Sequence, residues 1–193
     1  MKQNLAKAAG VYAAGAIIFS ALILSAYLAE VALGMTERGL PETAVKLGLM
    51  LAVGSYLVKR KALHEKRGNW QYVLLGLLPA AALLILRIAT GFHVKNVFDV
   101  IGIFTTAASE ELYYRAFGTY IFSKCGQINC GRLALMAAIF ALAHLVNAVL
   151  DPVGALVTVS IALALGTLLQ IVYLKTNSLA AVILLHFAVN MLG

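Results

Sequence analysis

Apolar residues fill most of the chain in seven long runs, and each run ends at charged or turn-forming residues. A helix of about 20 apolar residues is long enough to cross the hydrocarbon core of a bilayer. The runs predict spans at roughly 8–33, 42–58, 70–90, 97–122, 132–150, 153–174 and 178–192. We therefore expect an all-α fold, a polytopic transmembrane bundle of about seven spans that forms one membrane-embedded domain over residues 1–193.

The composition also indicates a membrane protein. Hydrophobic residues make up 62% of the 193 residues, charged residues make up 12%, and the mean hydropathy is +0.92. A soluble domain carries about 25% charged residues, so the chain is far too apolar for that class. Spans of this length use most of the chain and leave no room for a separate soluble domain.

Basic residues are concentrated in the predicted loops on one side of the bundle. That side carries Lys2, Lys7, Lys59, Arg60, Lys61, Lys66, Arg67, Lys124, Arg132 and Lys175, and the other carries Arg38, Arg87 and Lys95. Positively charged loops stay in the cytoplasm, so we expect a multi-pass protein of the cell membrane with a cytoplasmic N-terminus. Topology and anionic headgroups account for the net charge of +7, and nucleic acid is not expected as a partner.

Ionisable side chains interrupt three of the apolar runs. Glu110, Glu111 and Arg115 lie within the fourth run, His144 within the fifth and His186 within the seventh. A charged side chain at the centre of a membrane helix costs about 2.5 to 3.5 kcal/mol on insertion scales. At 1.5 Å per residue, the two glutamates and both histidines lie roughly 12 to 20 Å from the ends of their spans. Their similar depth favours one site built from several helices.

Helical spacing divides the roles of these polar residues. Glu111 and Arg115 are one turn apart and can form an ion pair along one face. Glu110 then points about 100° away from Glu111 and can face a cavity. His186 and Asn190 are also one turn apart, and together they can donate two hydrogen bonds to one oxygen, as an oxyanion requires. We expect Glu111 and Arg115 to support the site.

Three motifs in this order resemble those of one protease family. They are EExxxR at 110–115, FxxxH at 140–144 and HxxxN at 186–190. The set is similar to that of the CAAX protease and bacteriocin-processing (CPBP, or Abi) family of intramembrane endopeptidases. The resemblance covers roughly residues 97–193, and the first three spans carry no residue that we can assign to the family.

The resemblance implies four catalytic residues and a reaction. Glu110 would activate water, with His144 assisting it or holding the water, and His186 and Asn190 would form the oxyanion hole. A carboxylate in a low-dielectric cavity can accept a proton from water and return it to the leaving amine, so the chemistry is independently plausible. The implied activity is that of a glutamate-type intramembrane protease, which hydrolyses a peptide bond of a membrane-anchored protein or peptide in the lipid bilayer.

A zinc-dependent protease is an alternative that uses the same residues. Two histidines and a glutamate suit a catalytic zinc with one open position. However, the chain has no HExxH motif, its two span histidines come from separate helices, and Asn190 is a poor zinc ligand. We therefore favour chemistry without a metal or another cofactor.

Two non-proteolytic functions remain as alternatives. Buried Glu, His and Arg also form proton relays in transporters, but the sequence shows no two-fold repeat and no pair of broken helices in corresponding halves. A catalytically inactive relative could serve in immunity or scaffolding, yet all four catalytic candidates are present. The small chain suggests a prokaryotic protein, in which prenylated substrates are not expected, so we predict cleavage near a hydrophobic segment.

Overall fold

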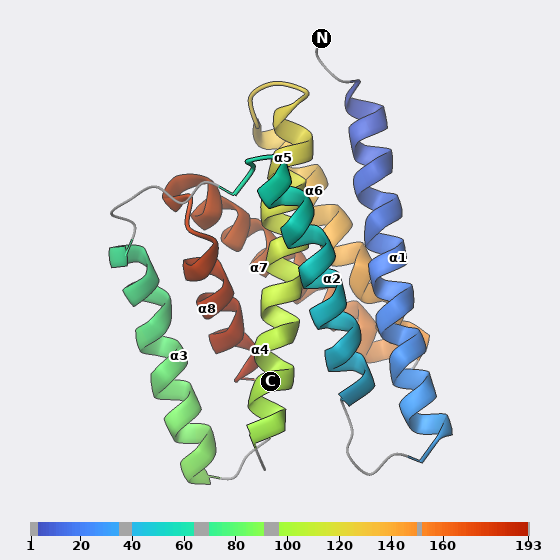
Figure 1. The fold of residues 1–193 in the computed structure, drawn as a ribbon, viewed down its shortest axis with the longest axis vertical. Coiled ribbons are helices and arrows are strands. Elements are labelled where there is room, and N and C mark those ends of the chain that lie inside the picture. Colours follow the sequence, from blue (N-terminus) through green and yellow to red (C-terminus); the bar gives the residue numbers. More distant parts are fainter. Residues whose placement is uncertain (1–3, 35–39, 64–69, 91–96, 150–151, 193) are drawn as a thin grey trace.

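The computed structural model describes residues 4–34, 40–63, 70–90, 97–149 and 152–192. Within these ranges every regular element is helical, and the helices form seven rods (Figure 1). The elements are α1 (Leu5–Ala32), α2 (Leu40–Lys59), α3 (Trp70–Thr90), α4 (Val97–Glu111), η1 (Leu112–Phe117), α5 (Gly118–Ser123), α6 (Cys130–Ala143), η2 (His144–Val149), α7 (Pro152–Thr176) and α8 (Leu179–Asn190). The predicted all-α bundle is confirmed.

Two of the predicted spans are not α-helical throughout, which corrects the sequence-based expectation. The fourth rod runs from α4 through the π-helical turn η1 into α5. The fifth rod leaves α-helical geometry at Ala143 and continues as the 3-10 helix η2. Because π-turns are wider and 3-10 turns tighter than α-turns, the simple 3.6-residue face argument does not apply at these two places.

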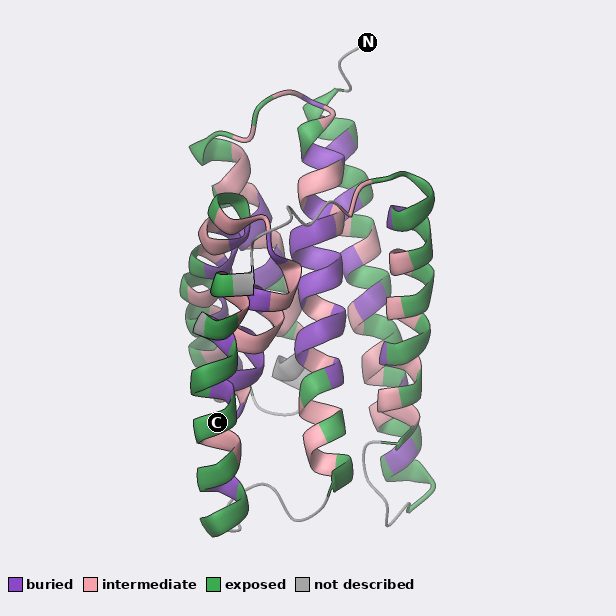
Figure 2. Cartoon of the chain, turned by 60° about the vertical axis from the view of Figure 1, so that its left-hand side comes forward, coloured by how far each residue is buried: buried purple, intermediate pink, exposed green. Residues whose placement is uncertain are grey.

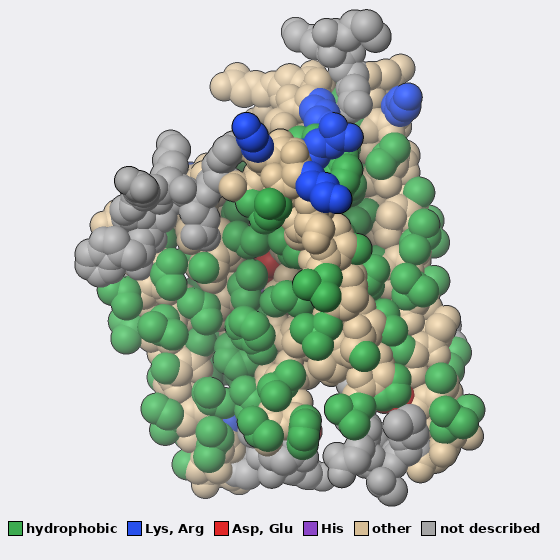
Figure 3. Space-filling model, viewed as in Figure 1, with side chains coloured by type: hydrophobic (Ala, Val, Ile, Leu, Met, Phe, Trp, Pro, Cys, Tyr) green, Lys and Arg blue, Asp and Glu red, His purple; other side chains and the backbone are tan. Residues whose placement is uncertain are grey.

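Among the described residues, three helices are long and apolar enough to cross a membrane by length and composition, namely Leu5–Ala32, Gln71–Thr90 and Pro152–Thr176. Large apolar side chains such as Ile17, Leu78 and Val153 are exposed on the outer faces, and Figure 3 shows hydrophobic side chains over most of the visible surface. Such a surface is suited to lipid and not to water. Together these features support a membrane location.

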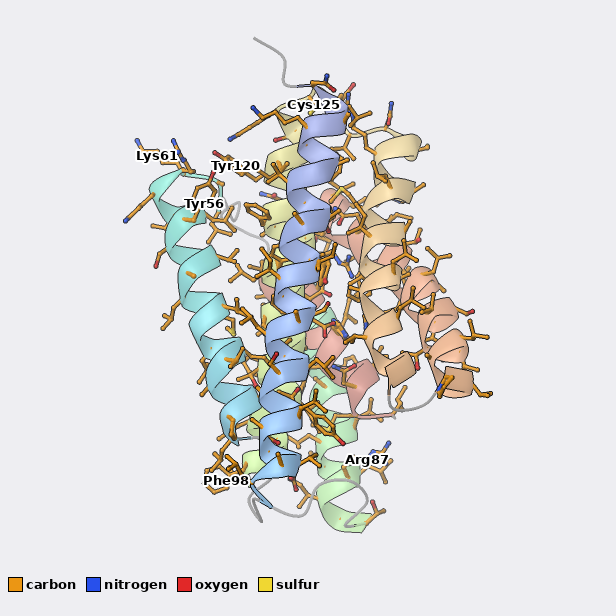
Figure 4. The ribbon with its side chains drawn as sticks, turned by 90° about the vertical axis from the view of Figure 1, so that its right-hand side faces the viewer. Tyr56, Lys61, Arg87, Phe98, Tyr120 and Cys125 are labelled. Atoms are coloured by element: carbon orange, nitrogen blue, oxygen red, sulfur yellow. The ribbon has the colours of Figure 1, made fainter. Side chains whose placement is uncertain are left out.

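Basic side chains gather at the end of the bundle that carries the N-terminus (Figure 3). Figure 4 places Lys61 and Tyr120 at this end and Arg87 at the opposite end. Lys61 and Arg87, which the sequence assigns to different sides of the membrane, therefore lie at opposite ends of the described structure. Which end faces the cytoplasm stays a prediction.

The rod formed by α4, η1 and α5 occupies the middle of the bundle. Helix α2 packs on α4, while α1 packs on α2 and α5. On the other side α8 packs on α4 and η1, and α3 packs on α8 at the periphery (Figure 1). Residues 107–116 of this rod are buried except for Glu110, which is half-buried, and Figure 2 shows buried residues along the middle of the bundle. The two adjacent glutamates, Glu110 and Glu111, thus lie in its most enclosed part.

A two-residue connection sets the position of α8 against α7. Asn177 has a φ of 51° directly after α7, a left-handed conformation that asparagine tolerates. The Ser178 hydroxyl then accepts a hydrogen bond from the Ala181 N–H at 3.3 Å and caps α8. This tight turn brings His186 back toward the middle of the bundle.

Candidate active site

Glu111 and Arg115 form a buried ion pair at the junction of α4 and η1. Arg115 Nε donates to Glu111 Oε2 at 2.9 Å, and Arg115 Nη2 donates to Glu111 Oε1 at 3.2 Å. Both side chains are 0% exposed. Two parallel charge-assisted hydrogen bonds fix the mutual orientation of the two groups. The ion pair predicted from the sequence spacing is confirmed.

His186 of α8 joins the same cluster and connects it to Glu110. Its Nδ1 lies 2.8 Å from Glu111 Oε1. Because an ionised carboxylate only accepts hydrogen bonds, Nδ1 carries a proton and donates it. The other ring nitrogen, Nε2, lies 3.8 Å from Glu110 Oε2. His186 therefore bridges the two adjacent glutamates, with one nitrogen directed to each.

Glu110 faces a cavity of about 250 Å³, as its position relative to Glu111 predicts. Residues of α1, α2, α4, η1, α6 and η2 line this cavity. Its lining includes the polar residues Ser20, Glu42, Lys46, Thr106, Glu110, Tyr114 and His144. The cavity therefore contains two of the four candidate catalytic side chains.

His144 lies where α6 passes into η2. Its Nδ1 is 3.0 Å from the Phe140 carbonyl oxygen. A carbonyl can only accept, so Nδ1 carries a proton, and in the neutral ring Nε2 keeps a lone pair. His144 lines the same cavity as the Glu110 carboxylate, and its neutral imidazole can supply one acceptor.

Phe140 supports both His144 and Arg115, as the FxxxH spacing suggests for the histidine. Its ring centroid is 4.8 Å from that of His144 and 4.5 Å from Arg115 Cζ. Gly166 of α7 leaves room for the ring, because a Cβ there would lie 2.6 Å from Phe140 Cδ1. The Arg115 guanidinium is thus hydrogen-bonded to Glu111 and also lies over the face of the Phe140 ring.

Asn190 ends α8 one turn beyond His186. Its side chain is half-buried and makes no hydrogen bond with the described part of the chain. Arg87 of α3 donates from Nε to the carbonyl of the neighbouring Met191, which ties the end of α8 to α3. The contribution of Asn190 to an oxyanion hole stays a prediction.

Sequence analysis did not single out the polar side chains that α2 contributes to the cavity. Lys46 is buried, forms an ion pair with Glu42, and donates to Thr106 Oγ1 at 2.6 Å. Thr106 lies one turn before Glu110 on α4. The available signal was a lysine inside an apolar run, four residues after a glutamate. A single lysine in such a run is easily read as one that reaches the membrane surface.

The arrangement of these donors does not suit zinc. A catalytic zinc requires three converging protein ligands, and the described residues include no cluster of three or more His, Cys, Asp and Glu side chains that could hold a metal ion. No catalytic step is therefore derived through a metal.

The family model described as type II CAAX prenyl endopeptidase Rce1-like matches residues 92–192, just over half of the chain. Comparisons with curated proteins and with solved structures found no match. The matched region includes the three motifs at 110–115, 140–144 and 186–190, whereas α1, α2 and α3 precede it. The protein therefore belongs to the Rce1-like family of type II CAAX prenyl endopeptidases.

Proposed function

We propose that the protein is an intramembrane endopeptidase in which Glu110 activates the water that attacks a peptide bond. One observation carries this assignment: Glu110 is the carboxylate of the central rod that lines the cavity, and it shares that cavity with His144. Membership of the family supports peptide-bond hydrolysis of a membrane-associated protein substrate. The residue roles are our own assignment.

In the proposed reaction, Glu110 and His144 hold one water molecule between them. Glu110 accepts a proton from the water while the water oxygen attacks the carbonyl carbon of the substrate. The Nε2 lone pair of the neutral His144 ring accepts a hydrogen bond from the same water. The carbonyl oxygen becomes an oxyanion. Glu110 then transfers its proton to the amine nitrogen, and the carbon–nitrogen bond breaks.

His186 and Asn190 are proposed to stabilise the oxyanion. The Asn190 amide donates directly, whereas His186 Nε2 donates when the ring carries both protons. Such an imidazolium has a carboxylate beside each nitrogen, Glu111 at 2.8 Å and Glu110 at 3.8 Å. Glu111 therefore orients His186, and Arg115 in turn orients Glu111. Preorganised donors of this kind are usually the largest contribution to acyl-transfer catalysis.

An apolar groove beside the cavity supports a substrate with a hydrophobic segment. The groove has a volume of about 390 Å³ and lies between α1 and α6. It shares the lining residues Ser20, Ala143 and Val146 with the cavity that Glu110 lines, so the two spaces adjoin. A hydrophobic segment in the groove would place the adjacent peptide bond near Glu110.

Cleavage by the purified protein in liposomes tests this function. Quenched-fluorescent hydrophobic and lipidated peptides are incubated with the wild type, with Glu110→Gln and with Glu65→Gln, each with and without EDTA. The matched control removes a carboxylate that the sequence places among the basic residues at 59–67, outside the motifs. Cleavage that is lost only in Glu110→Gln and persists in EDTA supports the proposal. Loss in EDTA would restore the zinc mechanism, and full activity of Glu110→Gln would exclude Glu110 as the base.

A further inference from the structure

The π-turn η1 leaves one backbone carbonyl without its usual partner. In an α-helix, the Gly118 N–H would bond to the Tyr114 carbonyl, four residues earlier. Here it bonds to the carbonyls of Tyr113 and Arg115, and the bond to Tyr113 is the five-residue closure of a π-turn. A buried carbonyl without a donor is costly, so the Tyr114 carbonyl needs a donor from elsewhere in the fold.

Tyr12 of α1 supplies that donor. Its hydroxyl donates to the Tyr114 carbonyl at 3.0 Å, and its side chain is 0% exposed. In return, the Tyr113 hydroxyl donates to the Tyr12 carbonyl at 2.7 Å. The two rings stack with centroids 5.6 Å apart and an interplanar angle of 6°. Two reciprocal hydrogen bonds thus tie α1 to the π-turn.

Two glycines make this close approach possible. A Cβ at Gly118 would lie 3.0 Å from Tyr12 Cε2, and a Cβ at Gly15 would overlap the Tyr113 hydroxyl. Both positions therefore exclude a side chain. The space that these glycines leave is filled by the two tyrosines that make the tie.

The π-turn also lies inside the charged cluster of the candidate site. It begins directly after Glu111 and contains Arg115, so the Glu111–Arg115 ion pair spans it. Glu111 must reach Arg115 at 2.9 Å and His186 at 2.8 Å at the same time. Because a π-turn rotates following residues relative to an α-turn, its conformation sets the direction in which Arg115 meets Glu111.

We propose that Tyr12 is a positioning residue for the active site: its hydroxyl holds the π-turn in the conformation that lets Glu111 bind Arg115 and His186 together. The catalytic part of this inference rests on the proposed function, whereas the effect on His186 does not. Tyr12 precedes the family match at 92–192, so helix α1 contributes to a site whose motifs all lie elsewhere.

Three variants separate this role from a general loss of packing. Tyr12→Phe removes the hydroxyl and keeps the ring. Tyr113→Phe removes the return hydrogen bond and leaves the donor to the Tyr114 carbonyl in place. Tyr27→Phe, at a half-buried tyrosine further along α1, is the matched control.

Isotope labelling gives a direct readout of the tie, because Tyr114–Arg115 is the only Tyr–Arg pair in the sequence. Carbonyl-carbon-13 tyrosine combined with nitrogen-15 arginine yields one labelled peptide group, whose carbonyl shift reports its hydrogen bonding. The ring nitrogens of His186 are followed with nitrogen-15 histidine and assigned with His186→Gln. Peptide cleavage provides kcat and KM for the same preparations.

In Tyr12→Phe we expect the Tyr114 carbonyl and the His186 Nδ1 signals to shift, and kcat to fall by about 10-fold to 100-fold with little change in KM. Tyr27→Phe should change none of these, and Tyr113→Phe should leave the Tyr114 carbonyl signal in place.

An unshifted carbonyl signal in Tyr12→Phe would refute the hydrogen bond from Tyr12 to the Tyr114 carbonyl. An unshifted His186 signal with wild-type kcat would refute the positioning role. If the wild type cleaves no peptide and the His186 signal still shifts in Tyr12→Phe, the positioning role is supported and only the proposed function fails.

Discussion

Glu111 Oε1 accepts a hydrogen bond from His186 Nδ1 at 2.8 Å, and the same oxygen accepts one from Arg115 Nη2 at 3.2 Å. A single carboxylate thus joins the central rod to α8, 75 residues further along the chain. Its neighbour Glu110 makes no comparably short contact with the described residues and lines the cavity. The two adjacent glutamates therefore lie in different surroundings: Glu111 is held in a buried ion pair, and Glu110 lines the cavity.

This difference predicts very unequal effects on stability for the same substitution at two adjacent glutamates. Glu111→Gln leaves the buried Arg115 charge unpaired, which should lower the free energy of unfolding by about 3 to 5 kcal/mol. Glu110→Gln removes a half-buried carboxylate with no short hydrogen bond and should change it by less than about 0.5 kcal/mol. Reversible unfolding in mixed micelles measures both. Equal losses would contradict the division of roles.

Replacing both members of the ion pair should be less harmful than replacing one. The Glu111→Met, Arg115→Met double variant removes both buried charges, so neither remains without a partner. Its loss of stability should be smaller than the sum of the two single losses, and the difference measures the coupling between the residues. Additive losses would mean that the ion pair contributes little to the fold.

Asn190→Ala tests the oxyanion hole separately from the fold. Loss of one oxyanion donor typically costs about 2.7 to 4 kcal/mol of transition-state stabilisation, seen as about 100-fold to 1,000-fold in kcat. Because the Asn190 side chain makes no hydrogen bond with the described residues, stability should be unchanged. Asn190→Asp should be at least as inactive, since a carboxylate cannot donate to an oxyanion. Wild-type kcat in Asn190→Ala would remove Asn190 from the proposed mechanism.

Lys46→Met tests the two polar side chains, Glu42 and Lys46, that α2 contributes to the cavity. The substitution leaves Glu42 as a second negative group near Glu110 and removes the hydrogen bond to Thr106. A hydrogen bond to a charged group contributes about 1.5 to 3 kcal/mol to stability. Because Glu42 is partly exposed, Lys46→Met should lower the free energy of unfolding by an amount near the lower end of this range. Adding Glu42→Gln should restore part of the stability in unfolding experiments. No recovery would show that the two side chains act independently.

Sequence reasoning identified the charged cluster because buried charge is costly in an apolar run and because helical spacing relates residues four apart. Both arguments are local. They led to the Glu111–Arg115 ion pair, which the structure confirms, and to Glu110 as the residue facing a cavity. The same spacing argument paired His186 with Asn190 as possible oxyanion donors, and the resemblance to a protease family added the candidate roles of Glu110 and His144 in activating water.

The remaining features depend on contacts between distant segments. Tyr12 looks like an ordinary apolar-face aromatic in the sequence, and only the fold shows that its hydroxyl serves the Tyr114 carbonyl. The π-turn itself cannot be read from a 3.6-residue period, since that period assumes an unbroken α-helix. Lys46 likewise has meaning only once α2 is packed on α4 and its ammonium reaches Thr106.

The fit of Phe140 beneath Arg115 predicts contrasting results for two glycine substitutions. A methyl group at Gly166 would lie 2.6 Å from Phe140 Cδ1, whereas one at Gly10 would have nothing within 4 Å. Gly166→Ala should displace the ring and lower the free energy of unfolding by about 1 to 3 kcal/mol. Gly10→Ala, in the exposed part of α1, should raise the free energy of unfolding by about 0.5 to 1 kcal/mol.

Because the Phe140 ring also contacts His144, Gly166→Ala should reduce kcat as well, measured with the peptide assay. Equal stability and activity of the two alanine variants would contradict close packing of the Phe140 ring against Gly166 of α7.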